Sequence, residues 1–352
     1  MNPIRWCVTL ALLVIVGCSR PVAALPDPPL PSPTPAAPVV FPRDAGPHDA
    51  LTEWWYYTGH LRSDRDGHQY GFEFVVFQVQ RQDAPTGYLA HFAVSDVDGQ
   101  RFSHQARVAQ GQSAAGFPLD LHGWRLGRQA SSDVIQASMK IGPGAEPPFR
   151  VDLRLTDEKP PALHHGGYID YGPAGGSYYY SRTRLNVVGE LGQTDGDVDP
   201  VSGIAWMDHQ WGNFVVASAG GWDWYSLQLD DDTELMLYVL RAATGETTGV
   251  YGSQVLADGT LRDLPPGSVL AESTDTWTSP HTGAVYPSAW LLTLPGGERL
   301  DVRPLLEDQE LWFPASSSAG RVGAMAYWEG AVRVTGDRTG VGYVELTGYA
   351  GD

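Results

Sequence analysis

The segment 203–225 gathers residue types that could carry out acid–base chemistry in apolar surroundings. Its sequence, GIAWMDHQWGNFVVASAGGWDWY, places four tryptophans, two aspartates and one histidine around a Gly-Gly turn. Burial raises the pKa of a carboxyl group, which can then stay protonated near neutral pH and act as a general acid. The alternative is a core hairpin whose polar groups bond to the backbone, because structural networks also gather such residues.

Two strands are expected to position these residues, because successive side chains of a strand point to opposite faces. On the first strand, one face carries Ala205, Met207, His209 and Trp211, and the other carries Ile204, Trp206 and Asp208. On the second, which follows Gly220-Gly221, one face carries Asp223, Tyr225, Leu227 and Leu229, and the other carries Trp222, Trp224, Ser226 and Gln228. Asp208 is therefore expected to face away from His209 and Trp211.

The chain from Phe41 onward is predicted to form many short strands separated by turns. Runs rich in β-branched and aromatic residues, or with alternating polarity, occur at 71–80, 88–97, 205–211, 222–229, 234–241, 289–294, 327–334 and 342–349. Turn sequences such as Asp98-Gly99 and Pro295-Gly296-Gly297 separate them, and no long helical periodicity is visible. This pattern indicates an all-β fold of antiparallel strands, either a sandwich or a barrel.

A length of 352 residues suits two cores, and the best boundary lies near 213–220, just after the first tryptophans. We expect domains at 41–214 and 215–352. If two barrels meet there, the aromatic segment lies at or near their interface, where ligand sites are common.

The first 40 residues indicate export and anchoring rather than folded structure. Arg5 precedes a short apolar run over 8–16 that ends at Gly17-Cys18, which resembles a bacterial lipobox. Residues 1–18 are thus predicted to be a lipoprotein signal peptide, Cys18 to be lipidated, and residues 19–40 to form a Pro-rich linker. We expect the protein in the bacterial cell envelope, anchored to the outer membrane and facing the periplasm. The alternative is an ordinary secretion signal with a chance cysteine.

Charge and missing motifs narrow the function classes. A formal net charge of -18 argues against nucleic acid, and against an anionic membrane surface as a direct partner. The sequence has no GxSxG, HExxH, P-loop or Rossmann glycine pattern. The histidines lack ligand spacing, so a dedicated metal site is not expected. We interpret His164 and His165 as loop residues before Gly166-Gly167.

Several blocks resemble the carotenoid 1,2-hydratase (hydroxyneurosporene synthase) and AttH-like family, in order along the whole mature body. They are FPRD at 41–44, TEWWYYTGH at 52–60, SYYYS at 177–181, WMDHQWG at 206–212, GWDWYSLQL at 221–229, LMLY at 235–238, YWEGAV at 327–332 and ELTGY at 345–349. The resemblance implies two consecutive lipocalin-like β-barrels.

The resemblance also implies possible chemistry. The family includes hydratases that add water to a terminal C=C of acyclic carotenoids, and secreted members often encoded beside ABC transporters; related two-barrel proteins are pericyclases. A His-x-Trp pair of the hydratases falls on His209 and Trp211, and a tyrosine of the next strand falls on Tyr238. The nearby acid of those enzymes has no counterpart here, so Asp223 and Asp208 are the substitutes.

Two functions follow as alternatives. The first is a membrane-anchored carrier that binds an elongated hydrophobic ligand, such as a carotenoid, isoprenoid or lipid, with an ABC transporter as a candidate partner. The second is a cofactor-free hydratase in which Asp223 or Asp208 protonates a C=C and His209 orients the acid or accepts a proton. Aromatic faces would stabilise the carbocation, and the candidates are Trp206, Trp211, Trp222, Trp224, Tyr225 and Tyr238.

Overall fold

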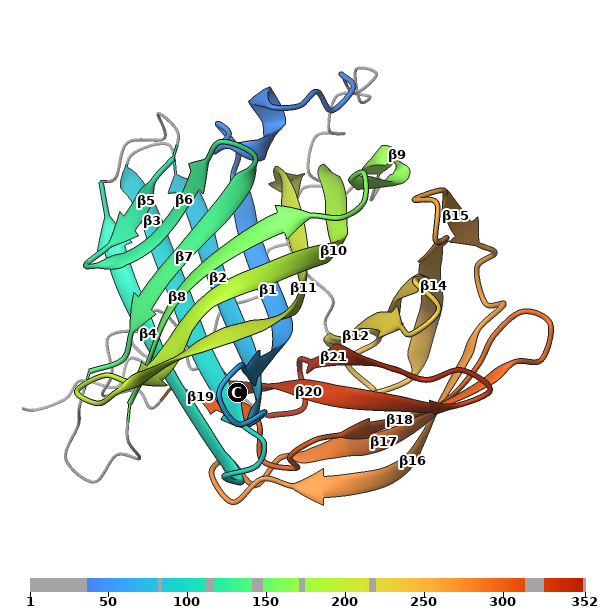
Figure 1. Ribbon diagram of the computed structural model, residues 1–352. Helices are drawn as coiled ribbons and strands as arrows, with labels where there is room; N and C mark the ends of the chain where they lie inside the picture. The colour runs from blue at the N-terminus through green and yellow to red at the C-terminus, as the bar shows by residue number, and fades with distance from the viewer. Residues whose placement is uncertain are drawn as a thin grey trace, which may run out of the picture. The chain divides into compact units, whose positions relative to one another are not determined.

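The computed structural model consists of β-strands and one short 3-10 helix, η1 (Arg43–Ala45), in the part of the chain that it describes (Figure 1). That part comprises residues 37–81, 84–111, 117–140, 148–170, 175–214, 220–313 and 326–350. All strand pairs are antiparallel, so the all-β prediction is confirmed. No helix among these residues is long and apolar enough to cross a membrane.

The first sheet has eleven strands in the order β4-β3-β2-β1-β11-β10-β8-β7-β6-β5, with β9 paired to β10. Its strands are β1 (Thr52–Ser63), β2 (Gln69–Arg81), β3 (Ala84–Asp96), β4 (Arg101–Gln110), β5 (Leu119–Leu121), β6 (Trp124–Gln129), β7 (Ser132–Ser138), β8 (Phe149–Asp157), β9 (Ala162–Asp170), β10 (Gly175–Gln193) and β11 (Val198–Phe214).

This sheet curls until its two ends approach each other. Arg107 on β4 donates hydrogen bonds to the carbonyl oxygens of Leu121, at 3.3 Å, and of Ser138, at 2.9 Å. Leu121 ends β5 and Ser138 ends β7, two strands near the opposite end of the sheet. The interior is filled by large apolar side chains, among them Trp55, Phe74 and Trp124, each with no exposed surface.

The second sheet has ten strands in the order β15-β14-β13-β12-β21-β20-β18-β17-β16, with β19 paired to β20. Its strands are β12 (Trp222–Leu229), β13 (Glu234–Arg241), β14 (Thr247–Val255), β15 (Leu261–Leu264), β16 (Leu270–Thr278), β17 (Val285–Thr293), β18 (Arg299–Pro304), β19 (Glu310–Trp312), β20 (Ala326–Gly336) and β21 (Gly340–Leu346). Tyr225, Trp290 and Trp328 belong to the core that this sheet encloses.

The predicted alternation of β11 and β12 is confirmed. Met207 and Trp211 lie in the core of the first sheet, and Tyr225 lies in that of the second. Trp206 and Trp224 point the other way and meet in a third buried cluster, to which both sheets contribute. The chain passes from one sheet to the other between Phe214 and Trp222. The two strands therefore present alternate residues to a core and to the contact between the sheets.

The segment before β1 and the strand β9 are both attached to the first sheet. The segment 37–50 packs on the first sheet, where the indole Nε1 of Trp55 donates to the carbonyl oxygen of Ala45 at 3.3 Å. His164 and His165 lie inside β9, so the interpretation of this pair as loop residues is wrong. The signal peptide, Cys18 and most of the linker lie outside the described residues.

Candidate active site

Four acidic residues come together where the sheets meet. Glu73 on β2 and Asp208 on β11 belong to the first sheet, and Glu329 on β20 and Glu345 on β21 belong to the second. Glu73, Asp208 and Glu329 are buried, and Glu345 is partly buried. We call these four residues the acid cluster. Hydrogen bonds from tyrosine, serine and tryptophan side chains lower the pKa values of its members, and the charges of neighbouring acids raise those of Glu73, Glu329 and Glu345.

Aromatic rings from both sheets surround the acid cluster. The rings of Trp206 and Trp224 meet edge to face with centroids 6.0 Å apart, and Tyr56 meets Trp224 in the same way at 5.3 Å. Trp222 and Tyr238 pack against the buried apolar cluster that contains Tyr56, Trp206 and Trp224. Such faces carry negative electrostatic potential and can stabilise a cation.

Glu329 has the properties of a general acid. The Tyr56 hydroxyl donates a hydrogen bond to its Oε1 at 2.5 Å, while its Oε2 is buried without a hydrogen-bond partner among the described residues. Burial, with the charges of Glu345 and Glu73, raises the pKa of Glu329 well above its usual value. The carboxyl group therefore keeps its proton at neutral pH.

Glu73 is also held protonated. The Tyr327 hydroxyl donates to its Oε1 at 3.0 Å, and His91 Nδ1 lies 2.6 Å from the same hydroxyl. Burial raises the pKa of Glu73 to about 8, against the hydrogen bond from Tyr327 and with the charge of Glu345. Trp222 Nε1 donates to Glu345 at 2.9 Å, and burial raises the pKa of Glu345 to about 7.

Asp208 is the most acidic member of the acid cluster. It accepts hydrogen bonds from Tyr179 at 2.6 Å, Ser181 at 2.5 Å and the indole of Trp206 at 2.7 Å. Burial raises the pKa of Asp208, but these three bonds stabilise its ionised form and limit the value to about 6. At neutral pH Asp208 is thus mostly a carboxylate, whereas Glu329 and Glu73 keep their protons. Carboxyl groups with separated pKa values can serve as a base and an acid in one site.

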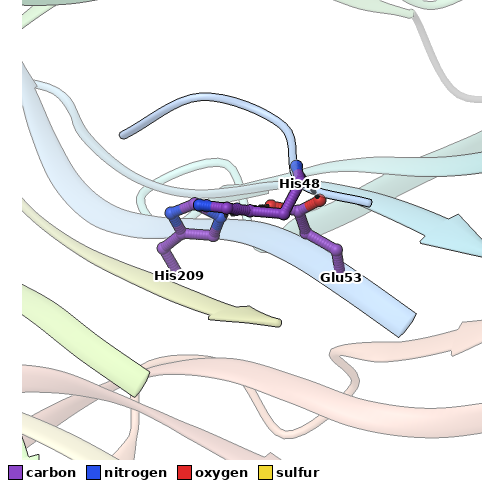
Figure 2. Close-up of side chains that lie close together, drawn as sticks. All are labelled: His48, Glu53 and His209. Atoms are coloured by element: carbon purple, nitrogen blue, oxygen red, sulfur yellow. Dashed lines mark hydrogen bonds and ion pairs between the residues drawn. The ribbon is translucent and has the colours of Figure 1, made fainter. Parts of the chain in front are cut away.

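His209 belongs to a different network, inside the first sheet (Figure 2). Its Nε2 lies 2.8 Å from Glu53 Oε1, and Nδ1 of His48 lies 2.7 Å from the same oxygen. The other carboxylate oxygen accepts from the His48 backbone at 2.8 Å and from Gln78 at 3.0 Å. Burial acts to raise the pKa of Glu53, but its bonds with His209 and His48 outweigh burial and lower the pKa.

The three side chains offer one ligand atom each within 4.8 Å of one another, as a metal site would. Two ligands of one tetrahedral metal ion stand about 3.3 Å apart when each bond is about 2.0–2.1 Å. The observed 2.7 and 2.8 Å are shorter and are hydrogen-bond lengths. We therefore describe His48, Glu53 and His209 as a hydrogen-bonded network and assign no metal ligands. This network joins His48 in the 37–50 segment to Glu53 on β1, and so attaches that segment to the first sheet.

Trp211 belongs to this network rather than to the acid cluster. Its ring stacks on His48 with centroids 4.0 Å apart and planes within 1°. His209 also stacks on Trp55, with centroids 4.8 Å apart. The His-x-Trp pair of the family resemblance therefore lies inside the first sheet, and Asp208 faces away from it, as the alternation predicts.

Asp223 lies on the core side of β12, apart from the acid cluster. Tyr349 donates to its two oxygens at 3.0 and 3.1 Å, and Arg241 Nη2 lies 3.3 Å away. Burial raises the pKa of Asp223 to about 6, the expected direction, while Arg241 opposes the shift. The expectation that His209 partners Asp223 is wrong, because His209 bonds to Glu53 and Tyr180 in the other sheet.

The structure thus distributes the predicted site residues over three places. Trp206, Asp208, Trp222, Trp224 and Tyr238 gather at the contact between the sheets; His209 and Trp211 lie in the first core; Asp223 and Tyr225 lie in the second. Sequence reasoning missed Glu73, Glu345 and the central role of Glu329. Each is a single acid inside an apolar strand, in FEF, YVEL and WEG, and that signal could have identified them.

A hollow of about 450 Å³ opens at the curled edge of the first sheet, lined by Arg107, His122, Gly123, Ser138, Met139, Lys140, Thr194 and Asp195. None of the acid cluster or its aromatic neighbours lines it. The only acid among the described residues that line the hollow, Asp195, is exposed, so we place the candidate site at the acid cluster, where buried acids lie beside aromatic rings.

Comparison with known proteins gives the family. Residues 32–349 match the AttH-like family. The structure is similar to the crystal structure of a protein provisionally called AttH from Nitrosomonas europaea, with a TM-score of 0.78 and 34% identity over 90% of this chain and 98% of that one. This likeness confirms the predicted lipocalin-like fold.

Kievitone hydratase from Nectria haematococca shares the fold, with a TM-score of 0.67 and 16% identity over 88% of this chain and 92% of that one. No curated protein matches the sequence. Because the family match spans most of the chain, and the relative from Nitrosomonas europaea covers nine-tenths of it, the protein belongs to the AttH-like family.

Proposed function

We propose that the protein is a cofactor-free hydro-lyase that adds water to, or removes it from, a C=C bond of an elongated, largely apolar substrate. The observation that carries the proposal is the acid cluster: protonated Glu329 and mostly ionised Asp208 lie among aromatic rings from both sheets. Carotenoid-, isoprenoid- or lipid-like alkenes are the substrate class that these apolar surroundings fit.

The chemistry would proceed in two steps. The carboxyl O–H of Glu329 gives its proton to one alkene carbon, which leaves a carbocation on the other carbon and a carboxylate on Glu329. The faces of Trp206, Trp224 and Tyr56 stabilise this cation. Water bonds to the cation, Asp208 accepts the released proton, and transfer of that proton back to Glu329 restores the enzyme.

The fold of kievitone hydratase supports this class of reaction, since a protein with that fold is named for adding water. The low identity carries no residue roles across, so the assignment of Glu329 and Asp208 rests on this chain alone. Water addition needs no redox step, and the scheme uses only side chains of the described residues.

A carrier without turnover is the competing function. The interior of the first sheet is filled by Trp55, Phe74, Phe92 and Trp124, so a carrier could not hold an elongated ligand there without moving these side chains. A lipid anchor at Cys18 and an ABC-transporter partner would suit a carrier. Both functions use the same ligand class, and they differ in whether the ligand leaves with added water.

The test is incubation of the purified protein with acyclic isoprenoid alkenes and unsaturated lipids in ¹⁸O-labelled water, followed by mass spectrometry. We expect a product with one labelled water, and a loss of about 100-fold to 10,000-fold in Glu329→Gln, the contribution of a general acid. Asp223→Asn is the matched control, because it changes a buried acid outside the acid cluster. Ligand bound and recovered unchanged, or full activity in Glu329→Gln, would overturn the proposal.

A further inference from the structure

A chain of hydrogen bonds runs from Asp208 on the first sheet to Ser253 on the second. Ser181 Oγ lies 2.5 Å from Asp208 Oδ1, His164 Nε2 lies 2.7 Å from Ser181 Oγ, and Ser253 Oγ lies 3.1 Å from His164 Nδ1. The three positioning groups are on β10, β9 and β14, so the chain joins both sheets. All four side chains are at most 4% exposed.

We propose that Ser253, His164 and Ser181 form a directional chain that holds Asp208 in its ionised, proton-accepting form. This inference rests on the proposed function for its catalytic meaning, since it concerns the residue that would accept the proton of water. Its physical content, the control of one carboxyl group by a remote histidine, can be measured without turnover.

The direction follows from counting donors and acceptors. A serine hydroxyl donates once, and a neutral histidine has one donor nitrogen and one acceptor nitrogen. If Ser181 donates to Asp208, it can accept from His164 Nε2–H, and Nδ1 then needs a donor, which Ser253 supplies. Each of the three hydrogens is then used once, and the chain points toward Asp208.

The opposite direction fits the surroundings of Asp208 less well. It would put a proton on Asp208 Oδ1, which already accepts from the indole of Trp206, and an indole N–H can only donate. Tyr179 donates to the other oxygen. Three donors aimed at one carboxyl group favour its ionised form.

Burial keeps His164 neutral, and nearby charges act on both ends of the hydrogen-bonded chain. Burial, with the charge of His165, lowers the pKa of His164 to about 3. Asp208 in turn interacts with Glu329 and Glu345 across the sheet contact, and its charge raises the pKa of both. A neutral His164 with a fixed tautomer therefore acts on Asp208 through Ser181, not through its own charge.

The experiment is an infrared titration of the Asp208 carboxyl band, identified by its loss in Asp208→Asn. Ser181→Ala removes a hydrogen bond to a charged group and is expected to raise the pKa of Asp208 by about one to two units. His164→Leu removes the donor that orients the Ser181 hydroxyl and should raise this pKa by less. His164→Gln keeps an N–H donor near Ser181 and should stay close to the unmodified protein. Ser253→Ala removes the donor to His164 Nδ1, so His164 can take either tautomer, and the pKa of Asp208 should rise by a smaller amount.

If the hydrogen-bonded chain has only a structural role, its variants should show a lower melting temperature and an unchanged pKa of Asp208. That result in folded Ser181→Ala and His164→Leu would overturn the inference. If His164→Leu does not fold, Ser181→Ala and Ser253→Ala decide. In the active protein, the acidic limb of the kcat/KM profile should move up by the same amount. If the unmodified protein shows no hydration, the proposed function fails while the infrared titration still decides this inference.

Discussion

Tyr56 and Glu329 are 273 residues apart and belong to different sheets, yet the tyrosine hydroxyl donates to Glu329 Oε1 at 2.5 Å in a buried setting. Neither sheet alone forms this contact. The proposed proton donor is therefore completed only when the two sheets meet, and its acidity depends on a residue of the other sheet.

Tyr56→Phe should lower turnover by about 10-fold or more while substrate binding stays unchanged. The hydroxyl stabilises the carboxylate that Glu329 becomes after giving up its proton, and a hydrogen bond to a charged group contributes about 1.5–3 kcal/mol. Steady-state kinetics with a separate binding titration would check this. Tyr225→Phe, which removes a hydroxyl in the second core, is the control, and an equal loss in both variants would contradict the assignment.

The stability of the protein should fall as pH rises from about 6.5 to above 8. The pKa of Glu73 is about 8 in the folded protein against a usual 4.5, so the folded state keeps a proton that the unfolded chain has lost. This contribution is fully present below pH 4.5 and is lost as pH rises through 8. Glu345, with a folded pKa of about 7, acts in the same direction.

Thermal melts between pH 6.5 and 8.5 would test this, and Glu73→Gln should flatten the curve. The window starts at 6.5 because the depressed pKa values of His60 and His104, both about 4, give the opposite slope below it. A variant with the same slope as the unmodified protein would show that Glu73 does not titrate in this range.

Sequence alone predicts several of the strands, and the faces of β11 and β12, because alternation is a local property that does not depend on partners. It cannot show that Glu73 and Glu329 meet, since their strands lie in different sheets and no periodicity links them. It places Asp223 beside Trp222 and Trp224 correctly along the chain, but neighbours in a strand point apart. Arg241 and Tyr349, the actual partners of Asp223, become adjacent only through strand pairing in the second sheet.

Asp223→Asn should leave turnover within about twofold and lower stability by about 1–3 kcal/mol, because Arg241 loses its charged partner in a buried place. Arg241 also lies over the Tyr349 ring, 3.8 Å from its centroid, so the change should loosen that contact too. Chemical denaturation together with the hydration assay checks both parts. A large loss of turnover in a stably folded variant would return Asp223 to the catalytic candidates.

Cys18→Ala should release the protein from the membrane fraction, because the apolar run before Gly17-Cys18 predicts lipidation at this residue. Fractionation of cells and detection of the chain by antibody would measure it. Cys7→Ala, which changes a cysteine inside the predicted signal peptide, is the control and should leave the fraction unchanged. Unaltered membrane association of Cys18→Ala would rule out the anchor.

The two-residue alternation of β11 has a consequence for how the protein tolerates change. Ala205, Met207, His209 and Trp211 serve one core, whereas Trp206 and Asp208 serve the contact between the sheets. A saturation scan along this strand should thus give phenotypes that alternate residue by residue, with loss of abundance at odd positions and loss of function in an abundant protein at even ones. A one-residue insertion would exchange the two sets, so we expect this strand to accept substitutions far better than changes of length.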